Sequence, residues 1–527
     1  MAALVPGSST AGDLGGLARG SALNLLGAFT ATVANLGLVV VVTRGNSPTT
    51  AGAFFTVVSA FLLGSAVARL GTNTGLVFFV ARSRAAAATN ITHLLRLACL
   101  PVIAMTSVLA IAAWIWAPQL GQLLLGDDAA SAVGMLRVMA LALPAGVMHE
   151  VFLAVTRGYR QMAATVLIER IGIPVGQFLC LFVTVSLDGT ATFLAIAWAA
   201  PYPPALVAAW WAWKRVLRKN ASPSVGQSSL TAGTFWRFTA PRAMSSVAQL
   251  AMARADILLV AALRGPAEAA LYTAATRFVV VGQLAIQALS INVQPRIAEL
   301  ASTADYVEAG RIYRVATTWL VLLAWPLYLT TGVFASQVLA IFGDSYQGTR
   351  TVAVVVIMSV VMLAATASGM VDVFLNMAGR SSWTLVNAGV ALATMVGLDL
   401  LLIGPYGAVG AAVGWATAIA VRNTMALAML WWGFRLHPFG RASGLAIAVS
   451  LFAFALTPAA GAFFTAGSLS GRIAGLMLGC VVFVVALVRW RVPLQTAVLV
   501  DQLKRRRGKA RASEAPAEKG SSANDIG

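Results

Sequence analysis

Charged residues are scarce in this chain. Of its 527 residues only 10% are charged, whereas 59% are hydrophobic. A soluble domain cannot bury so much apolar surface, so the composition excludes a water-soluble globular protein and predicts one that lies mostly in lipid. Acidic residues are rarer than basic ones, 18 against 37, which gives a formal net charge of +19. Because the basic residues lie between long apolar runs, they favour cytoplasmic membrane loops over nucleic-acid binding.

The residues of catalytic and metal chemistry are also few. Three histidines are too few for a histidine-based site, and the three cysteines, Cys99, Cys180 and Cys480, all lie inside apolar runs without metal or disulfide spacing. The sequence has no Walker loop, nucleophile elbow or His-Glu-x-x-His motif. The longest loop on one side, around 118–132, is too short for an external catalytic domain. The sequence therefore predicts no enzyme, no metal and no cofactor.

Long apolar runs are what the sequence does have. A spanning helix needs about 20 mostly apolar residues, and fourteen segments meet that need. Their approximate limits are 17–43, 51–80, 91–117, 133–157, 161–186, 190–213, 236–262, 268–291, 312–335, 351–376, 381–403, 407–433, 442–464 and 470–489.

Loop charges predict the orientation of these spans. With the N-terminus inside, the loops on the inner side hold the basic residues of 82–84, 157–160, 214–219, 296–314, 380 and 435–441, and the tail run 504–507 joins them. The outer loops keep only Arg44, Arg264, Arg350 and Arg472. This alternation predicts a multi-pass protein of the cytoplasmic membrane with both termini in the cytoplasm.

The chain divides into six segments. The ends are rich in Gly, Ser, Ala, Glu and Lys, which predicts disorder. We expect a disordered N-terminus at 1–16, a first lobe of six helices at 17–213, a cytoplasmic linker at 214–235, a second lobe of six helices at 236–433, an appended helix pair at 442–489 and a basic disordered tail at 490–527.

The two lobes carry traces of one repeated sequence. Glu150–Leu153 (EVFL) returns as Asp372–Leu375 (DVFL), 222 residues later, and Ala53–Thr56 (AFFT) returns as Ala270–Thr273 (ALYT), 217 residues later. Both matches pair helices that run in the same direction, so they predict lobes related by a pseudo-two-fold axis along the membrane normal. Duplicated membrane proteins commonly bind their cargo between the two copies.

Charges deep inside the spans are the candidate site. An ionisable side chain at mid-membrane costs on the order of 3 kcal/mol, so each needs an explanation. The deep arginines are Arg69, Arg254, Arg277 and Arg422, and the deep carboxylates are Glu169 and Asp256. Because arginines outnumber carboxylates, a cavity that they line would be net positive. Such a cavity suits phosphate or acidic sugars, which arginine binds in a bidentate manner.

Structural roles are the alternative for these charges. Asp256 could pair with Arg254 or Arg277 across adjacent helices, and Asp256 or Glu169 could instead take part in ion coupling. Glu150 and Asp372 lie near the inner ends of their spans, where water is within reach; they are either interfacial or a symmetric pair that closes an inner gate. Arg69 and Arg422 have no carboxylate at pairing distance within their own helices, which favours a functional role.

Short motifs in the second lobe carry a family resemblance. They are Asp256–Val260 (DILLV), Arg264-Gly265, Tyr272–Phe278 (YTAATRF), Phe342–Tyr346 (FGDSY), Ala378-Gly379-Arg380 and Gly404–Ala412 (GPYGAVGAA). In this order, and with twelve helices plus two, the chain resembles the multidrug/oligosaccharidyl-lipid/polysaccharide flippase superfamily, most closely its polysaccharide-unit exporters of the O-antigen type.

The resemblance implies an all-α membrane protein that flips a polyprenyl-diphosphate-linked oligosaccharide by alternating access between two lobes, for polysaccharide biosynthesis and export. Its implied partners are this lipid-linked saccharide, membrane lipids and polysaccharide-assembly proteins. Arg277 occupies the place of a cavity arginine in the related lipid II flippases. Those flippases carry an Arg-Asp pair in helix 1, whereas residues 21–43 here hold no charge, and their helix 2 arginine aligns nearer Ser65 than Arg69.

Four functions stay open on the sequence. We favour a flippase in which Arg277, Arg254, Arg69 and Arg422 bind the diphosphate or acidic sugars. The alternatives with the same fold are a cation-coupled multidrug antiporter and a lipid II flippase. A third class is a scaffold that recruits envelope enzymes through its basic tail.

Overall fold

The described residues form an all-helical protein. The computed structural model describes residues 11–86, 91–126, 129–219 and 231–493, and within them there is no strand. Fourteen helical segments there are long and apolar enough to cross a membrane, which confirms the predicted fold class and number of spans. Helices are the expected solution, because backbone polar groups in lipid must be satisfied within their own segment.

The first six spans contain several interruptions. They consist of α1 (Ala11–Gly45); α2 (Pro48–Ala68) with α3 (Thr72–Ala86); α4 (Ile91–Ile115); α6 (Ala129–Gly158); α7 (Met162–Thr165), the π-helix η2 (Val166–Gly172) and α8 (Ile173–Ser186); and α9 (Ala191–Ala199) with α10 (Tyr202–Lys219). A short helix, α5 (Ala117–Leu125), connects α4 to α6.

The second six spans are followed by a final pair. They are α11 (Ala232–Arg264), α12 (Pro266–Ser302), α13 (Tyr306–Val333), α15 (Thr349–Ala367) with α16 (Val371–Met377), α17 (Ser381–Tyr406) and α18 (Ala408–Phe434), with α14 (Ala335–Ala340) and the 3₁₀ turn η3 (Asp344–Tyr346) before α15. The pair consists of α19 (Arg441–Leu451), η4 (Phe452–Leu456) and α20 (Thr457–Phe464), then α21 (Leu469–Arg489).

The expected segment ends need correction. Residues 11–16, which we expected to be disordered, are the first turns of α1. The expected linker 214–235 starts inside α10 and ends inside α11. At the end of α10 the run Lys214–Lys219 (KRVLRK) consists mainly of strong helix formers, so this helix continues past the apolar run that the sequence delimits. Residues 1–10, 220–230 and 494–527, which include most of the expected disordered ends, lie outside the described residues.

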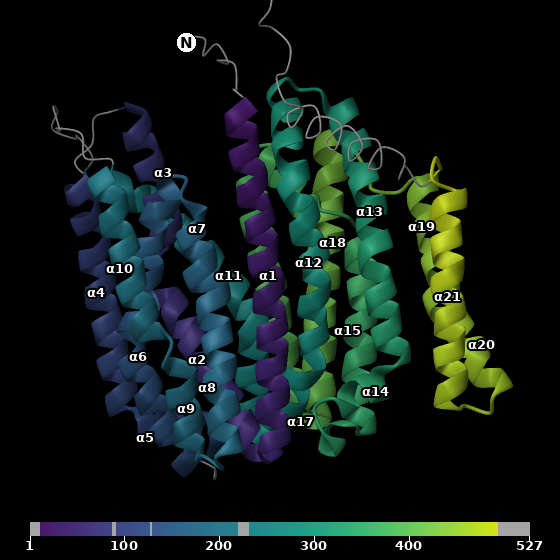
Figure 1. Ribbon diagram of the computed structural model, residues 1–527, viewed down its shortest axis with the longest axis horizontal. Coiled ribbons are helices and arrows are strands. Elements are labelled where there is room, and N and C mark those ends of the chain that lie inside the picture. The colour runs from purple at the N-terminus through teal and green to yellow at the C-terminus, as the bar shows by residue number, and fades with distance from the viewer. Residues whose placement is uncertain (1–10, 87–90, 127–128, 220–230, 494–527) are drawn as a thin grey trace, which may run out of the picture.

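The spans form two bundles with α2 between them. In Figure 1 most of the first six spans lie on the left, the second six lie to their right, and α19–α21 stand at the right edge. Helix α2 packs against α6 of its own half and against α11 and α12 of the other half. The final pair attaches through α19, which packs on α13. That contact buries Trp325 against Phe454 and their aliphatic neighbours.

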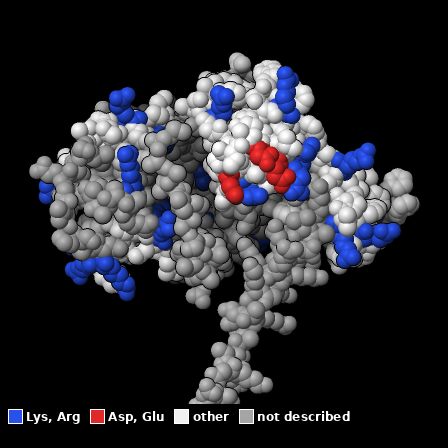
Figure 2. Space-filling model, turned by 90° about the horizontal axis from the view of Figure 1, so that it is seen from above, with Lys and Arg blue, Asp and Glu red and all other residues white. Residues whose placement is uncertain are grey.

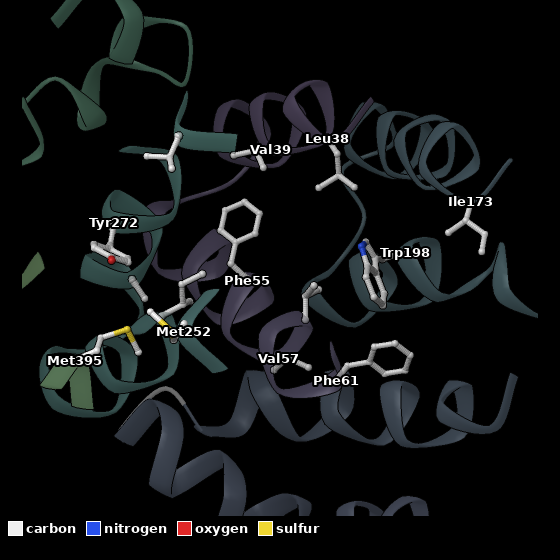
Figure 3. Close-up of a cluster of buried hydrophobic side chains, with 14 of the residues drawn as sticks. Leu38, Val39, Phe55, Val57, Phe61, Ile173, Trp198, Met252, Tyr272 and Met395 are labelled. Atoms are coloured by element: carbon white, nitrogen blue, oxygen red, sulfur yellow. The ribbon is translucent and has the colours of Figure 1, made fainter. Parts of the chain in front are cut away.

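A buried aromatic cluster runs through the first bundle to the second. Figure 3 shows Phe55 of α2 between Tyr272 and Met252 on one side and Trp198 and Phe61 on the other. The Phe61 and Trp198 rings meet edge to face, 5.2 Å apart. Lipid gives little hydrophobic drive for helices to associate, so close packing of this kind is what joins them.

Two spans are broken near the same face of the protein. Span 2 breaks between α2 and α3, where Leu70 and Gly71 have φ of 51° and 70°. Span 10 breaks between α15 and α16, where Gly369 has a φ of 73°. The left-handed region that these residues adopt ends an α-helix and frees backbone groups. Arg69 lies at the first break, as the C-cap of α2, and Asp372 lies at the second break, in the first turn of α16.

One face of the protein is strongly basic. Figure 2 views the end at which α1 begins and α10 ends, and far more Lys and Arg than Asp and Glu side chains are visible there. This is the end that the loop charges predict to be cytoplasmic.

Candidate functional site

A cavity of about 200 Å³ lies among α11, α12 and α18. Arg254 and Asp256 reach it from α11, Tyr272 and Arg277 from α12, and Arg422 from α18. Gln249, Thr276, Gln283 and Trp415 add further polar groups to its wall. The structure therefore brings together three of the four arginines that the sequence singled out, with one of the two carboxylates.

Arg254 and Arg277 also face the first half of the molecule. Both line a second cavity of about 220 Å³, whose other wall includes Asn35 of α1, Phe55 of α2 and Gln177 of α8. The two guanidinium-bearing residues thus lie at the boundary between the halves. Duplicated transporters place their binding sites at such a boundary.

Asp256 is held by hydrogen bonds rather than by an arginine. The Tyr272 hydroxyl donates to one of its carboxylate oxygens at 2.5 Å, and the backbone N–H of Ile257 donates to the other at 2.8 Å. The ion pair with Arg254 or Arg277 that the structural alternative predicts is absent among the described residues. The tyrosine and the backbone satisfy the carboxylate, so both arginines stay available for other partners.

Arg277 is only partly committed within the protein. Its Nε donates to the carbonyl of Thr273, one helical turn earlier, at 3.1 Å. The side chain is half-buried, and its terminal guanidinium nitrogens form no ion pair with a described residue. This bond fixes the direction of the side chain and leaves the two terminal amino groups, each of which has hydrogen-bond donors for an oxyanion.

Arg69 has a carboxylate partner that its own helix did not reveal. It lies at the C-cap of α2 and forms an ion pair with Glu150 of α6. Asn73, on the other side of the break, donates to the same Glu150 oxygen at 2.7 Å. The sequence indicated no carboxylate at pairing distance within the helix of Arg69, and the partner indeed comes from a neighbouring helix, 81 residues along the chain. Glu150 therefore braces the break in span 2.

Arg422 is paired in a similar way. It forms an ion pair with Asp372, near the start of α16, and so braces the break in span 10. Arg422 and Gln249 also line a third cavity, of about 340 Å³, together with Arg242 and Asp372. This cavity and the first one share a wall, which extends the polar lining toward the basic face.

Glu169 is neutralised outside these cavities. It lies on the π-helix η2 and pairs with Arg157 of α6 at 3.2 Å. Its neighbour Arg170 turns away and donates to the carbonyl of Asn24 at 3.5 Å. Adjacent positions point in different directions on a helix, which is why Glu169 and Arg170 do not pair with each other.

Asp399 is a buried carboxylate that our reading of the sequence missed. It lies on α17, is 0% exposed, and neither of its oxygens has a hydrogen-bond partner among the described residues. A Cβ atom at Gly414 of α18 would collide with Oδ1 of Asp399, so the glycine is what makes room for the carboxylate. An aspartate inside the run Gly397–Leu402 (GLDLLL), followed by a glycine in the next helix, was the available signal.

The unpaired charge of the first cavity, which lies among α11, α12 and α18, is positive. Asp372 neutralises Arg422, which leaves Arg254 and Arg277 against Asp256. No group of three or more His, Cys, Asp and Glu residues suited to a metal occurs in the described part of the chain. The arrangement can bind an anion with two guanidinium groups.

Solved transporters share this architecture. No protein-family model matches the sequence, and no curated protein matches it. A lipid II flippase MurJ structure in an inward closed conformation matches with a TM-score of 0.68 and 11% identity, over 88% of this chain and 98% of that one. An inward-facing multidrug resistance MATE family transporter of the MOP superfamily matches with 0.60 and 15%, over 76% and 93%.

A third match concerns the polarity of the pocket. A MOP superfamily transporter from Pyrococcus furiosus, described as having a binding pocket of reverse polarity, matches with a TM-score of 0.54 and 16% identity, over 79% of this chain and 94% of that one. Identities this low establish the fold alone. The chain has the fold of the MATE and MurJ transporters of the MOP superfamily.

Proposed function

We propose that this protein is a flippase that moves a polyprenyl-diphosphate-linked oligosaccharide across the cytoplasmic membrane, with both termini in the cytoplasm. The observation that carries the proposal is the pair Arg254 and Arg277, which lines two adjoining cavities at the boundary between the halves without an ion-pair partner among the described residues. Two guanidinium groups suit a diphosphate, because each can donate two parallel hydrogen bonds to phosphate oxygens.

The other charged residues have supporting roles in this proposal. Glu150 and Asp372 form an inner gate, since each holds an arginine at a broken helix near the basic face. Arg69 and Arg422 join the binding of cargo when these ion pairs open. Asp256 couples an ion to the movement, because its carboxylate faces the same cavity as the two arginines. Glu169, paired with Arg157 outside the cavities, is the second coupling residue.

Transport proceeds by alternating access in this proposal. The two halves rock about the boundary where Arg254 and Arg277 lie, and the diphosphate moves with them while the polyprenyl tail stays in lipid. The final pair, α19–α21, gives the tail a surface to follow. Assembly proteins of a cell-surface polysaccharide supply the cargo on one side and use it on the other.

A cation-coupled multidrug antiporter is the rival with the same fold. A cationic drug would meet the positive charge of Arg254 and Arg277 in the cavity, and like charges at close range in a low dielectric repel strongly. The sign of the cavity therefore favours an anionic cargo.

Charge removal at the two arginines tests the proposal. In vesicles that contain a polyprenyl-diphosphate-linked oligosaccharide, we expect Arg277→Gln and Arg254→Gln each to slow flipping about 10- to 100-fold, because each loses charge-assisted hydrogen bonds. Arg277→Glu is expected to abolish flipping. The matched control, Arg350→Gln, removes an exposed arginine outside these cavities and is expected to flip like the unaltered protein.

The same vesicles separate the rival functions. Unchanged flipping in Arg277→Glu at matched protein content would remove this residue from the site. Uptake of cationic dyes that increases in Arg277→Gln, with no saccharide-lipid flipping by the unaltered protein, would favour the antiporter. Loss of function on truncation of residues 501–527 alone would favour the scaffold.

A further inference from the structure

A groove on the outside of the first half has the chemistry of a lipid site. It has a volume of about 480 Å³ and lies between α4 and α10, which both pack on α6. Six of its lining residues are apolar or aromatic, three are basic and none is acidic: Leu95, Arg96, Cys99, Leu100, Ile103, Trp213, Lys214, Leu217 and Arg218. None of these residues lines the cavities that hold Arg254 and Arg277.

The two kinds of lining residue are separated along the membrane normal. Arg96 lies near the start of α4, and Lys214 and Arg218 lie near the end of the antiparallel α10, so all three basic groups gather at the basic face. Leu100 and Ile103 follow on α4 one and two turns deeper, and they are 69% and 49% exposed. Basic groups above an apolar trough match the division between a phosphate headgroup and its acyl chains.

The basic groups of the groove lack acidic partners. Arg96, Lys214 and Arg218 form no ion pair with a described residue. Lys214 instead lies over the Trp210 ring, 3.7 Å from its centroid. Tryptophan and lysine at the end of a spanning helix are typical of the headgroup level of a bilayer. An anion from the bilayer itself is the partner that can reach all three.

The wall of the groove is fixed in place. Trp213 stacks on Phe152 of α6, with ring centroids 5.1 Å apart and planes only 5° from parallel. Leu95 is buried against the same bundle. A wall held by packing keeps its shape without an occupant, which lowers the entropic cost of binding.

The third spanning helix of the second half is covered by protein, whereas that of the first half is exposed. There α13 is covered by α19, which buries Val321, Leu322 and Trp325. The third spanning helix of the first half, α4, exposes Leu100, Val108 and Ile111 along its length. Protein covers one of these two helices, and lipid is left to cover the other.

We propose that this groove, defined by the nine residues above, binds an anionic phospholipid of the leaflet at the basic face. The phosphate lies among Arg96, Lys214 and Arg218, and an acyl chain follows Leu100 and Ile103 toward mid-membrane. The occupant is a bilayer lipid rather than the transported cargo, because the groove faces outward from the first half and shares no residue with the central cavities.

Lipid retention tests this site. The protein is purified from nanodiscs that contain phosphatidylglycerol or phosphatidylcholine, and bound lipid is measured by native mass spectrometry. We expect one tightly held phosphatidylglycerol, and a triple variant Arg96→Gln/Lys214→Gln/Arg218→Gln is expected to bind it on the order of 100-fold more weakly at low salt, since each basic group near an anionic surface contributes a factor of about five.

A matched triple variant controls for net charge. Arg82, Arg215 and Lys219 are exposed, lie at the same face and do not line the groove. Changing all three to Gln removes the same charge and is expected to leave the tightly held lipid in place. Equal retention by both triple variants, or equal loss from both, would overturn the site.

Cys99 gives a second measurement that does not depend on retention after purification. In a chain with Cys180→Ser and Cys480→Ser it is the remaining thiol, and it lines the groove. We expect phosphatidylglycerol to slow its reaction with an apolar maleimide relative to phosphatidylcholine, and the groove triple variant to remove this difference. Stronger protection by a polyprenyl diphosphate than by phosphatidylglycerol would assign the groove to the cargo and overturn the proposal.

Discussion

Several charged residues inside the spans have partners on other helices. Arg69 meets Glu150, Arg422 meets Asp372, and Asp256 accepts from Tyr272. Each of these contacts lowers the free-energy cost of placing a charged group in a low-dielectric interior. These contacts leave Arg254 and Arg277 without an acidic partner among the described residues. The two residues identify the candidate site better than the total number of arginines does.

The Arg69–Glu150 pair is expected to stabilise the first half. Its side chains are 22% and 17% exposed, so Glu150→Gln and Arg69→Gln should each lower the unfolding free energy by about 1–3 kcal/mol, since each leaves a partly buried charge unpaired. The double variant should lose less than the sum. Unfolding in mixed micelles measures all three. The exposed Arg296–Glu299 pair is the control, with an expected change within about 0.5 kcal/mol. Strict additivity at Arg69 and Glu150 would contradict the pairing.

Asp399 is expected to cost stability. Neither of its oxygens has a hydrogen-bond partner among the described residues, and its side chain is fully buried. The isosteric change Asp399→Asn removes the possibility of a buried charge, so we expect the midpoint of thermal unfolding to rise. Asp188→Asn, at an exposed left-handed position that both residues tolerate, is the control and should change little. A lower midpoint for Asp399→Asn would mean that a bound ion or proton stabilises the carboxylate.

At the residue scale the sequence indicated which charged residues line the cavity among α11, α12 and α18 better than it indicated their contacts. Arg254, Asp256 and Arg277 stood out because ionisable residues are rare in apolar spans. The Arg69–Glu150 contact was not predictable, since it depends on how α2 packs beside α6. Asp399 was missed because an aspartate four residues from the end of a predicted span resembles an interfacial residue.

At the scale of the helix, small residues set how closely the two halves approach. Gly52 of α2 lies against the carbonyl oxygen of Pro266, the first residue of α12. Any Cβ at position 52 would overlap that oxygen, so the glycine is required by contact rather than by backbone conformation. Small residues at helix interfaces are the usual way for membrane helices to pack closely.

Gly52→Ala is therefore expected to destabilise the junction between the halves. Overlap with backbone cannot be relieved by a rotamer change, so a loss of about 1–3 kcal/mol in unfolding free energy is expected. Gly64→Ala on the same helix is the matched control, because a Cβ there meets open space and alanine favours the helix. Thermal unfolding of the two variants compares them directly. Equal stability of Gly52→Ala and Gly64→Ala would show that α2 and α12 do not approach so closely.

The sequence predicted the helices far better than their interruptions. Length and hydropathy are sufficient for fourteen spans, since a segment that crosses lipid must satisfy its backbone polar groups by hydrogen bonds within the protein, as a helix does. The break at Leu70–Gly71 was not foreseen, because leucine rarely adopts a φ of 51° and surrounding packing must impose it. The π-helix at 166–172 carries no sequence signal that periodicity can detect.

At the scale of the whole molecule, one arginine joins the halves at the face opposite the basic one. Arg44, at the end of α1, donates from Nε to the carbonyl of Ile341 at 2.7 Å and from Nη2 to that of Ala340 at 3.1 Å. These carbonyls lie at the end of α14, where a helix leaves its last acceptors unsatisfied. The contact links the two halves at this face.

Arg44→Gln is expected to open that face. Loss of the two hydrogen bonds should shift the equilibrium toward the state open there by about 10-fold. Spin labels at Leu187 and Arg350, exposed positions on the two halves at this face, should report more long distances by pulsed electron resonance. Arg472→Gln, in the first turn of α21 on the same side but in the final pair, is the control. An unchanged distance distribution in Arg44→Gln would show that the contact does not hold the face closed.

The break in the second span has a further consequence for motion. Below it, α2 packs on α11 and α12 of the second half as well as on α6; above it, α3 packs mainly on α6 and also on α11, where Phe78 stacks on Phe238. A single membrane crossing thus contacts both halves, and it changes direction at Leu70 and Gly71. If the two halves rotate against each other, this crossing must bend at Leu70 and Gly71. Arg69 lies next to this bend, so the angle between α2 and α3 decides whether its ion pair with Glu150 is kept or broken.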